Sequence, residues 1–154
     1  MSAAVPSNLP VLLPEASGYK GTVVHDEGEI KLTIDCDGRP EQSVLHHASQ
    51  VIANLQRLDE KCRAYIARAS VAAYNQNWRV GVVANPDGST APFEREWLNE
   101  QGFANLLRLA SIGITGDRVT DFWYECGDLY WGHMLYVTAF DGLSFDDLDV
   151  QLFG

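Results

Sequence analysis

The fold is decided at residues 122–140, which read FWYECGDLYWGHMLYVTAF. Two runs rich in aromatic and β-branched residues flank Gly127-Asp128, a dipeptide suited to a two-residue β-turn. The sequence therefore predicts a hairpin whose turn sets the register of both strands. In that register Cys126 faces Leu129, Tyr124 faces Trp131 and Phe122 faces His133, and these side chains share the core face with Leu135 and Val137.

The second face of this predicted hairpin is rich in aromatic side chains, and Gly132 leaves a gap where backbone or a ligand could approach. Three explanations are open. The N-terminal segment around Val11–Leu13 or a helix around Trp97 covers the face, or a protein or second copy of the chain binds it, or it lines a small-molecule pocket. The face carries Trp123, Glu125, Tyr130, Met134 and Tyr136.

The side chains of this hairpin would suit two kinds of chemistry. Cys126 with His133 would make a nucleophile and base, and His133 with Asp128 or Glu125 would make a hydrolytic or metal cluster. In the predicted register Cys126 and His133 lie beyond hydrogen-bond reach of each other. Glu125 points to the opposite face and Asp128 lies in the turn. We therefore assign no catalytic, cofactor-binding or metal-ligating residue, and expect His133 to be structural.

Outward from the hairpin, the pattern predicts an α+β fold in which one sheet packs against helices. Residues 75–91 stay open, apart from an apolar run at 80–84 and a loop composition after it. The expected elements are a first hairpin (Tyr19–Asp26 and Glu29–Asp37, turning at Glu27-Gly28), two consecutive helices (Glu41–Leu58, then a helix capped by Asp59 and running to about Tyr74), a short helix (Pro92–Phe103, with Phe93 and Trp97 inward), an antiparallel meander (Leu106–Thr115, Arg118–Cys126 and Leu129–Phe140) and a last strand near Val150–Phe153.

The length of 154 residues suits one core. We expect a flexible arm over residues 1–17 and a single domain over 18–154. Val23 is expected opposite Leu32 and His25 opposite Ile30, with His25 as a partly covered residue at the rim of the core. His46 and His47 are expected to be solvated, and the three cysteines to be buried thiols.

The formal net charge of −10 restricts the partners. Nucleic acids and anionic membranes would be repelled, whereas a basic protein would be attracted. An acidic loop that holds Asp146, Asp147 and Asp149 adds to this charge. Residues 1–18 have no signal-peptide pattern and no apolar run is long enough to span a membrane, so we expect a soluble, cytoplasmic protein.

A family resemblance rests on Tyr74-Asn75 with Trp78, on Ser111-Ile112 with Ile114, and above all on the motif at 127–133, which reads GDLYWGH. The chain resembles a bacterial family numbered 2262 in the domain-of-unknown-function series, over nearly everything after the arm. Met134 and Asp141-Gly142 depart from the family pattern. The resemblance implies a fold without established chemistry. Such domains resemble small α+β proteins encoded near bacterial toxins, where an acidic partner neutralises a basic effector.

These observations predict a non-enzymatic protein-binding domain without cofactors, in its narrowest form an immunity-type protein that neutralises a basic toxin. The alternatives are a small hydrolase or metal-dependent enzyme using His133 with Asp128 or Glu125, and a housekeeping homodimer. The candidate partner-binding residues are Trp123, Glu125, Tyr130, Met134, Tyr136, Asp146 and Asp147, and the structural motif is Gly127, Asp128, Trp131, Gly132 and His133.

Overall fold

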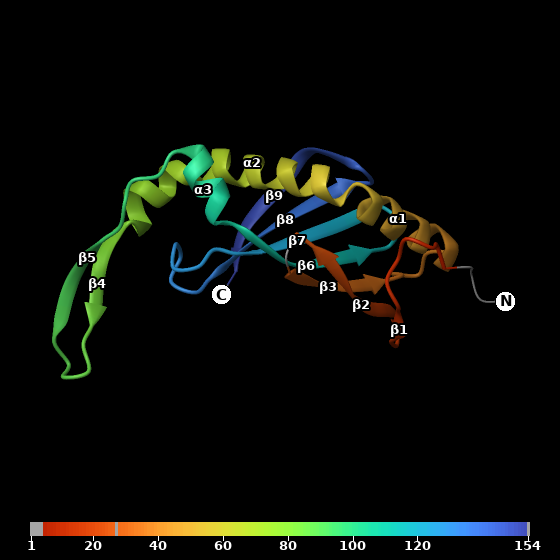
Figure 1. Ribbon diagram of the computed structural model, residues 1–154, viewed down its shortest axis with the longest axis horizontal. Coiled ribbons are helices and arrows are strands. Elements are labelled where there is room, and N and C mark those ends of the chain that lie inside the picture. The colour runs from red at the N-terminus through yellow and green to blue at the C-terminus, as the bar shows by residue number, and fades with distance from the viewer. Residues whose placement is uncertain (1–4, 27, 154) are drawn as a thin grey trace.

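The computed structural model describes residues 5–26 and 28–153 (Figure 1). Its helical elements are α1 (Glu41–Ala53), α2 (Leu55–Ala73), the π-helical turn η1 (Tyr74–Trp78) and α3 (Glu100–Leu106). Its strands are β1 (Leu13–Pro14), β2 (Gly18–His25), β3 (Gly28–Asp35), β4 (Val80–Ala84), β5 (Thr90–Glu94), β6 (Arg108–Thr115), β7 (Val119–Glu125), β8 (Met134–Asp141) and β9 (Ser144–Phe153).

Seven of the strands form one sheet in the order β1-β2-β3-β6-β7-β8-β9. Neighbouring strands run antiparallel, except that β3 and β6 are parallel. A parallel pair needs a long crossover, and here the crossover contains α1, α2, the β4–β5 hairpin and α3. The predicted α+β class is confirmed, with the N-terminal hairpin and the meander joined in one mixed sheet.

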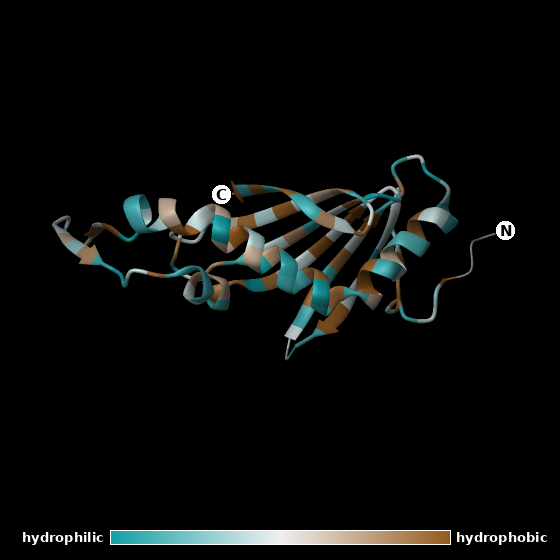
Figure 2. Cartoon of the chain, turned by 90° about the horizontal axis from the view of Figure 1, so that it is seen from above, coloured by the Kyte–Doolittle hydropathy of each residue, from teal (hydrophilic) through white to brown (hydrophobic). Residues whose placement is uncertain are grey.

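The core lies between the sheet and helices α1 and α2, which pack against one of its faces (Figures 1 and 2). Alternation in β3 turns Ile30, Leu32 and Ile34 inward, as the sequence pattern predicts. Burying one such side chain contributes about 1.5 to 3 kcal/mol. The helices oppose them with a buried apolar stripe that comprises Val44, Leu45, Ala48, Val51, Leu55, Leu58, Cys62 and Ile66.

The two helices meet at Asn54, four residues before the end predicted for the first helix. The Asn54 amide Nδ2 donates a hydrogen bond of 2.8 Å to the carbonyl oxygen of Gln50, and such side-chain bonds compete with helical ones. The prediction that Asp59 caps the second helix is therefore wrong. Asp59 lies inside α2 with only 4% of its surface exposed.

Residues 74–99 differ most from the expected structure. The chain passes through η1 into a two-stranded sheet, β4 paired with β5, that projects from the body (Figure 1). The helix predicted over Pro92–Phe103 is wrong in its first half, because Pro92 lies in β5, a short strand that can accommodate a proline. Helix α3 begins at Glu100 instead, after Asn99 accepts a hydrogen bond of 2.7 Å from the Gly102 N–H. Trp97 precedes it and is 67% exposed rather than inward.

The predicted two-residue turn at Gly127-Asp128 is also wrong. Strand β7 ends at Glu125 and β8 begins at Met134, which pair directly, so residues 126–133 form a wider loop. Consecutive turns inside it bond the N–H groups of Leu129, Trp131 and His133 to the carbonyl oxygens three residues before them. Tyr124 consequently faces Leu135 and not Trp131. The register shift is even, so Phe122, Tyr124, Leu135 and Val137 still share the core face, as predicted.

The first hairpin is shifted in the same manner. Val23 pairs with Ile30 and His25 with Gly28, rather than with Leu32 and Ile30 as predicted. Gly28 is the first residue of β3 rather than part of the turn, and Glu27 lies outside the described residues. The shift is again even, so Val23 keeps its place in the core.

At the N-terminus, β1 adds a short edge to the sheet by pairing Leu13 with Lys20 and Pro14 with Tyr19. Leu9 and Leu12 pack against the core while Val11 is exposed. The flexibility of residues 1–17 and the domain boundary at residue 18 stay predictions, and residues 1–4 lie outside the described part. Among the described helices, none combines the length and hydropathy needed to cross a membrane.

Candidate functional site

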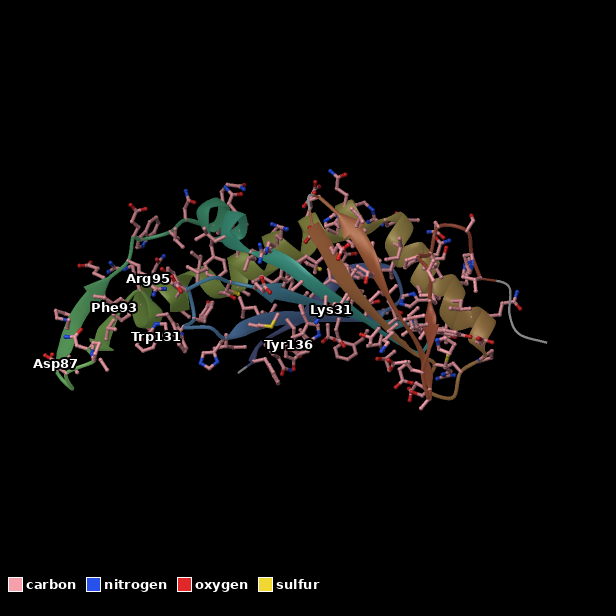
Figure 3. The ribbon with its side chains drawn as sticks, turned by 60° about the horizontal axis from the view of Figure 1, so that its bottom comes forward. Lys31, Asp87, Phe93, Arg95, Trp131 and Tyr136 are labelled. Atoms are coloured by element: carbon pink, nitrogen blue, oxygen red, sulfur yellow. The ribbon has the colours of Figure 1, made fainter. Side chains whose placement is uncertain are left out.

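The face of the seven-stranded sheet opposite α1 and α2 is here called the outer face (Figure 3). No helix in the described part of the chain covers it, and the β5–α3 connection that carries Trp97 runs beside α2 and α3 (Figure 1). The N-terminal segment lies against Gly21, on the face that carries Leu32. Cross-strand pairing arranges its side chains in rows. One row is Lys31, Ser111, Trp123, Tyr136 and Gln151, and the next is Thr33, Gly113, Asp121, Thr138 and Asp149.

An aromatic row crosses the outer face at β7, β8 and β9, and we define it as Trp123, Tyr136 and Phe153. Trp123 stacks on Tyr136 with ring centroids 4.3 Å apart and planes 19° from parallel. Phe153 meets Trp123 edge-on at 5.2 Å and is 57% exposed. The Tyr136 hydroxyl donates to Gln151 Oε1 at 2.6 Å, which orients the ring. The sequence pattern found Trp123, Tyr136 and the adjoining Met134 but missed Phe153.

Acidic side chains flank the aromatic row. Asp121 accepts a hydrogen bond of 2.5 Å from the Thr138 hydroxyl, and Asp149 accepts one of 2.7 Å from the Gln151 amide. Because the Thr138 hydroxyl and the Gln151 amide are neutral, these hydrogen bonds do not neutralise the negative charges of the two carboxylates. Glu125, in contrast, forms an ion pair of 2.5 Å with Arg108.

The 126–133 loop, which holds the recognition motif, has a packing role. Tyr130 was predicted on the second face but is buried, with its ring against Tyr74, Trp78 and Phe103. Burial raises the pKa of its hydroxyl to about 12. Trp131, expected in the core, is instead 52% exposed in a left-handed conformation.

Trp131 joins this loop to the β4–β5 hairpin. Its ring meets Phe93 at 5.3 Å, and both rings lie so close to Gly81 that a β-carbon there would be about 3 Å from each. Figure 3 shows Trp131, Phe93 and Arg95 near one another at the base of the hairpin. The loop therefore positions the projecting hairpin rather than a reactive group.

His133 is half-buried, with its ring 6.1 Å from that of Trp78. Asp128 is exposed, and Glu125 is engaged by Arg108. Over residues 5–26 and 28–153, the one group of three or more potential metal ligands is a different set, namely His25, Asp26 and Asp59. His133 therefore does not form, with Asp128 or Glu125, a ligand cluster of the kind that the hydrolase hypothesis needs.

The second notable site is a broad, open groove at the end of the sheet where β3 and β6 begin. Pairing between these parallel strands starts only at Lys31 and Ser111, so their preceding residues diverge. The groove is lined by the β2–β3 hairpin, α2, the 126–133 loop and the adjoining parts of β6 and β7. The lining includes His25, Asp26, Arg63, Arg108, Glu125 and His133.

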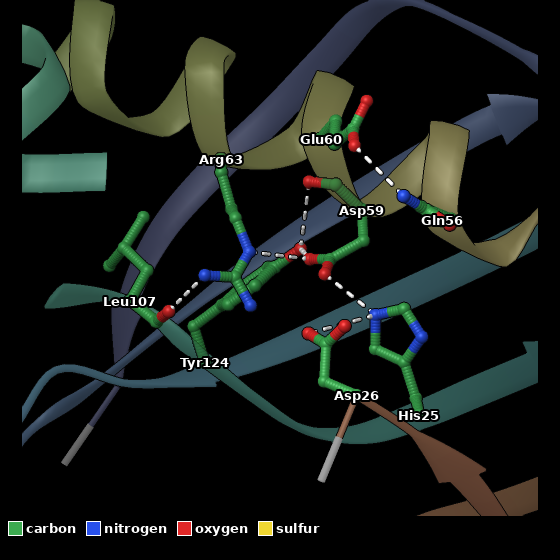
Figure 4. A network of polar contacts seen from close by, with 8 residues as sticks. All are labelled: His25, Asp26, Gln56, Asp59, Glu60, Arg63, Leu107 and Tyr124. Atoms are coloured by element: carbon green, nitrogen blue, oxygen red, sulfur yellow. Dashed lines mark hydrogen bonds and ion pairs between the residues drawn. The ribbon is translucent and has the colours of Figure 1, made fainter. Parts of the chain in front are cut away.

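A network centred on Asp59 connects this groove to the core (Figure 4). One carboxylate oxygen, Oδ1, accepts from the Tyr124 hydroxyl at 2.5 Å and from Arg63 Nε at 3.0 Å. The other, Oδ2, lies 2.9 Å from His25 Nε2. His25 Nε2 is also 3.6 Å from Asp26 Oδ2. Arg63 donates a further bond of 2.5 Å to the carbonyl oxygen of Leu107.

The electrostatics of the network follow from burial. Burial raises the pKa of Tyr124 well above its usual value, with Cys62 and Asp59 adding to the effect, so its hydroxyl stays protonated and donates. Burial alone would lower the pKa of Arg63, but the hydrogen bond and charge of Asp59 outweigh it and raise that pKa. Burial likewise raises the pKa of Cys62 and brings that of Cys126 to about 11, so both thiols stay protonated.

Sequence reasoning missed this network because the position of Asp59 predicts a helix cap. A signal was present: Asp59 falls on the stripe that also carries Leu55, Cys62 and Ile66, and a carboxylate on such a stripe must find partners in the core. His25 was correctly expected to be partly covered at the rim.

His47 also departs from its expected solvated position. It is 5% exposed, and its Nε2 lies 3.0 Å from the Thr120 hydroxyl, whereas its neighbour His46 is exposed. Burial lowers the pKa of His47, opposed by the charge of Asp117 and assisted by that of His46.

The acidic segment near the C-terminus is part of strand β9 and not a loop. Asp146 pairs with Lys61 of α2 at 2.7 Å, and this hydrogen bond lowers the pKa of the Asp146 carboxyl. Asp146 is therefore engaged on the helical side of the sheet, while Asp147 is exposed.

Comparison with known proteins identifies a family. A family model described as "Uncharacterized protein conserved in bacteria (DUF2262)" matches residues 12–146. No curated protein and no solved structure matches the chain. The matched range includes the Asp59 network, the 126–133 loop and two members of the aromatic row, Trp123 and Tyr136, while Phe153 lies beyond it.

Proposed function

The chain belongs to the DUF2262 family of bacterial proteins, and we propose that it is a non-enzymatic domain that binds a basic segment of a partner protein on its outer face. The resemblance to this family seen in the sequence is thereby confirmed, whereas the likeness to immunity-type proteins stays a prediction. The family description names no activity, so the proposal rests on the site. The observation that carries it is the aromatic row, which lies partly exposed on a sheet face that no described helix covers.

The aromatic row suits contact with a protein. Stacked Trp and Tyr rings offer large, rigid contact areas at a low cost in conformational entropy, and both residue types are enriched among the residues that dominate binding energy. Met134, beside Phe153 in the same cross-strand row, adds an adaptable apolar contact.

The charges favour a cationic partner. Asp121 and Asp149 lie in the row next to Trp123 and Tyr136, so a Lys or Arg side chain over an aromatic ring would also meet a carboxylate. The net charge of −10 would speed the encounter with a basic protein through long-range attraction. In its narrowest form the proposal is an immunity-type protein whose acidic surface covers a basic toxin, and this form rests on analogy.

The test compares two tryptophan variants in a bacterial host that encodes the protein. Tagged wild type is expected to recover a basic protein, whose affinity for purified bait is then measured by titration. Trp123→Ala is expected to weaken this affinity at least tenfold, about 1.4 kcal/mol or more, because it removes one of the two stacked rings. The matched control is Trp97→Ala, which removes an exposed tryptophan away from the outer face.

The proposal would be contradicted if Trp123→Ala bound the partner as tightly as wild type does. It would also be contradicted if only Trp97→Ala lost affinity for the partner. Light scattering at several protein concentrations measures the molecular mass and so distinguishes a homodimer from a monomer that binds a basic partner. If a second copy of the chain occupies the outer face, Trp123→Ala shifts the mass toward the monomer and no basic partner is recovered.

A further inference from the structure

We propose that His25, Asp26 and Asp59 form a binding site for a divalent transition-metal ion at the mouth of the groove. This inference does not depend on the proposed function of the outer face. It rests on the one set of side chains in the described part of the chain that brings together enough potential metal ligands.

The donor atoms already have the spacing that a metal requires. One ligand atom from each of His25, Asp26 and Asp59 lies within 4.8 Å of the other two. His25 Nε2 is 2.9 Å from Asp59 Oδ2 and 3.6 Å from Asp26 Oδ2. Two ligands that each bind a metal at about 2.1 Å are separated by about 3.0 to 3.4 Å, so small side-chain movements would complete the site.

The two carboxylate oxygens of Asp59 have different partners. Its Oδ1 is held by Tyr124 and Arg63, whereas its Oδ2 faces His25 and Asp26 (Figure 4). Outer partners of this kind orient a ligating carboxylate and are a common feature of metal sites. The carboxylate is buried and fixed, so little conformational entropy would be lost when Oδ2 binds a metal.

The site is open on one side. His25, Asp26 and Arg63 line the groove, and Asp26 is largely exposed at the tip of the β2–β3 hairpin. Three protein ligands with an open position toward solvent is the arrangement in which a metal can also take a water or a small anionic ligand from the groove.

The ligand set selects the class of metal. One imidazole nitrogen and two carboxylate oxygens suit Zn²⁺ or another first-row divalent ion. Mg²⁺ prefers oxygen ligands in near-octahedral geometry and retains several waters, so it should bind much more weakly here.

Calorimetric titration of the chelator-treated full chain with zinc chloride tests the proposal. Wild type is expected to show saturable binding of one equivalent. His25→Gln and Asp26→Asn should each weaken binding by about tenfold or more, because each removes a ligand. Asp26→Asn is preferred to a substitution of Asp59, since Asp26 is exposed and its variant should stay folded, as circular dichroism would verify.

Two matched controls address other zinc ligands. His46→Gln removes an exposed histidine of α1, and Cys36→Ser removes a half-buried thiol, and neither should change the affinity. Cobalt(II) gives a second readout: visible d–d bands without the intense near-ultraviolet band of thiolate ligands. The proposal is overturned if zinc does not bind saturably, or if His25→Gln and Asp26→Asn bind zinc as tightly as wild type.

Discussion

Among the described residues, Asp59 carries the one buried carboxylate, with 4% of its surface exposed. Removing a charged group from water costs several kcal/mol unless partners compensate for the lost hydration. Tyr124, Arg63 and His25 provide that compensation from three different elements. The network therefore ties β7, α2 and the β2–β3 hairpin together around one residue.

A change of Tyr124 to Phe tests how much the hydrogen bond to Asp59 contributes to the free energy of unfolding. Tyr124→Phe keeps the buried ring but removes the hydroxyl that donates to Asp59 Oδ1, so the free energy of unfolding should fall by about 1 to 3 kcal/mol. Urea unfolding followed by circular dichroism would measure it.

Tyr136→Phe is the matched control. It also removes a hydroxyl that donates to a side chain, but its bond to Gln151 is exposed, and the change should stay within about 0.5 kcal/mol. Equal losses in the two variants would show that the Asp59 network contributes no more than a surface contact.

At the scale of elements, the β2–β3 hairpin depends on close approach of its strands. Gly18 begins β2 opposite Asp35, the last residue of β3. A β-carbon at Gly18 would lie 1.7 Å from the carbonyl oxygen of Ile34, a backbone atom that cannot move aside without disturbing the ladder. Gly28, at the opposite end of the same hairpin, has open space around the corresponding position.

These two glycines make a paired experiment. Gly18→Ala is expected to lower the free energy of unfolding by about 2 kcal/mol or more, since the backbone must shift to relieve the clash. Gly28→Ala should change it by no more than about 0.5 kcal/mol. Chemical denaturation of both variants checks the difference, and a tolerated Gly18→Ala would mean that this end of the hairpin does not pack as described.

At the scale of the whole molecule, stability is distributed unevenly. The seven-stranded sheet is closed on one face by α1 and α2, whereas β4 and β5 form a separate sheet of two strands that projects from the body. An isolated two-stranded hairpin is marginally stable in water. Its valines Val80, Val82 and Val83 are exposed, and packing of Phe93 against Trp131 anchors it at the base.

Hydrogen exchange should therefore separate these two parts. Paired amides of β4 and β5 are expected to exchange by local opening, with a free energy several kcal/mol below that of amides in β6, β7 and β8. Exchange followed by NMR or mass spectrometry measures both at once. Equal protection across the two sheets would contradict this division and would imply that the hairpin unfolds only with the core.

Periodicity alone was enough to predict the faces of the strands. Ile30, Leu32 and Ile34 alternate with polar residues, and Phe122, Tyr124, Leu135 and Val137 kept their face although the loop between them proved wider than a tight turn. The reason is that a strand has a period of two, so an even error in register leaves every side chain on its predicted face. Trp123 and Tyr136 were found on the outer face by the same rule.

Tertiary packing decided the rest. Tyr130 and Trp131 are adjacent and both aromatic, and only the contacts with Tyr74 and Phe93 determine that the first is buried and the second exposed. Asp59, Tyr124 and His25 are far apart in the chain, and they meet because the sheet and α2 pack together. Local sequence specifies the period and the breaks of an element, whereas the surroundings of a buried charge are created by segments that the chain brings together only on folding.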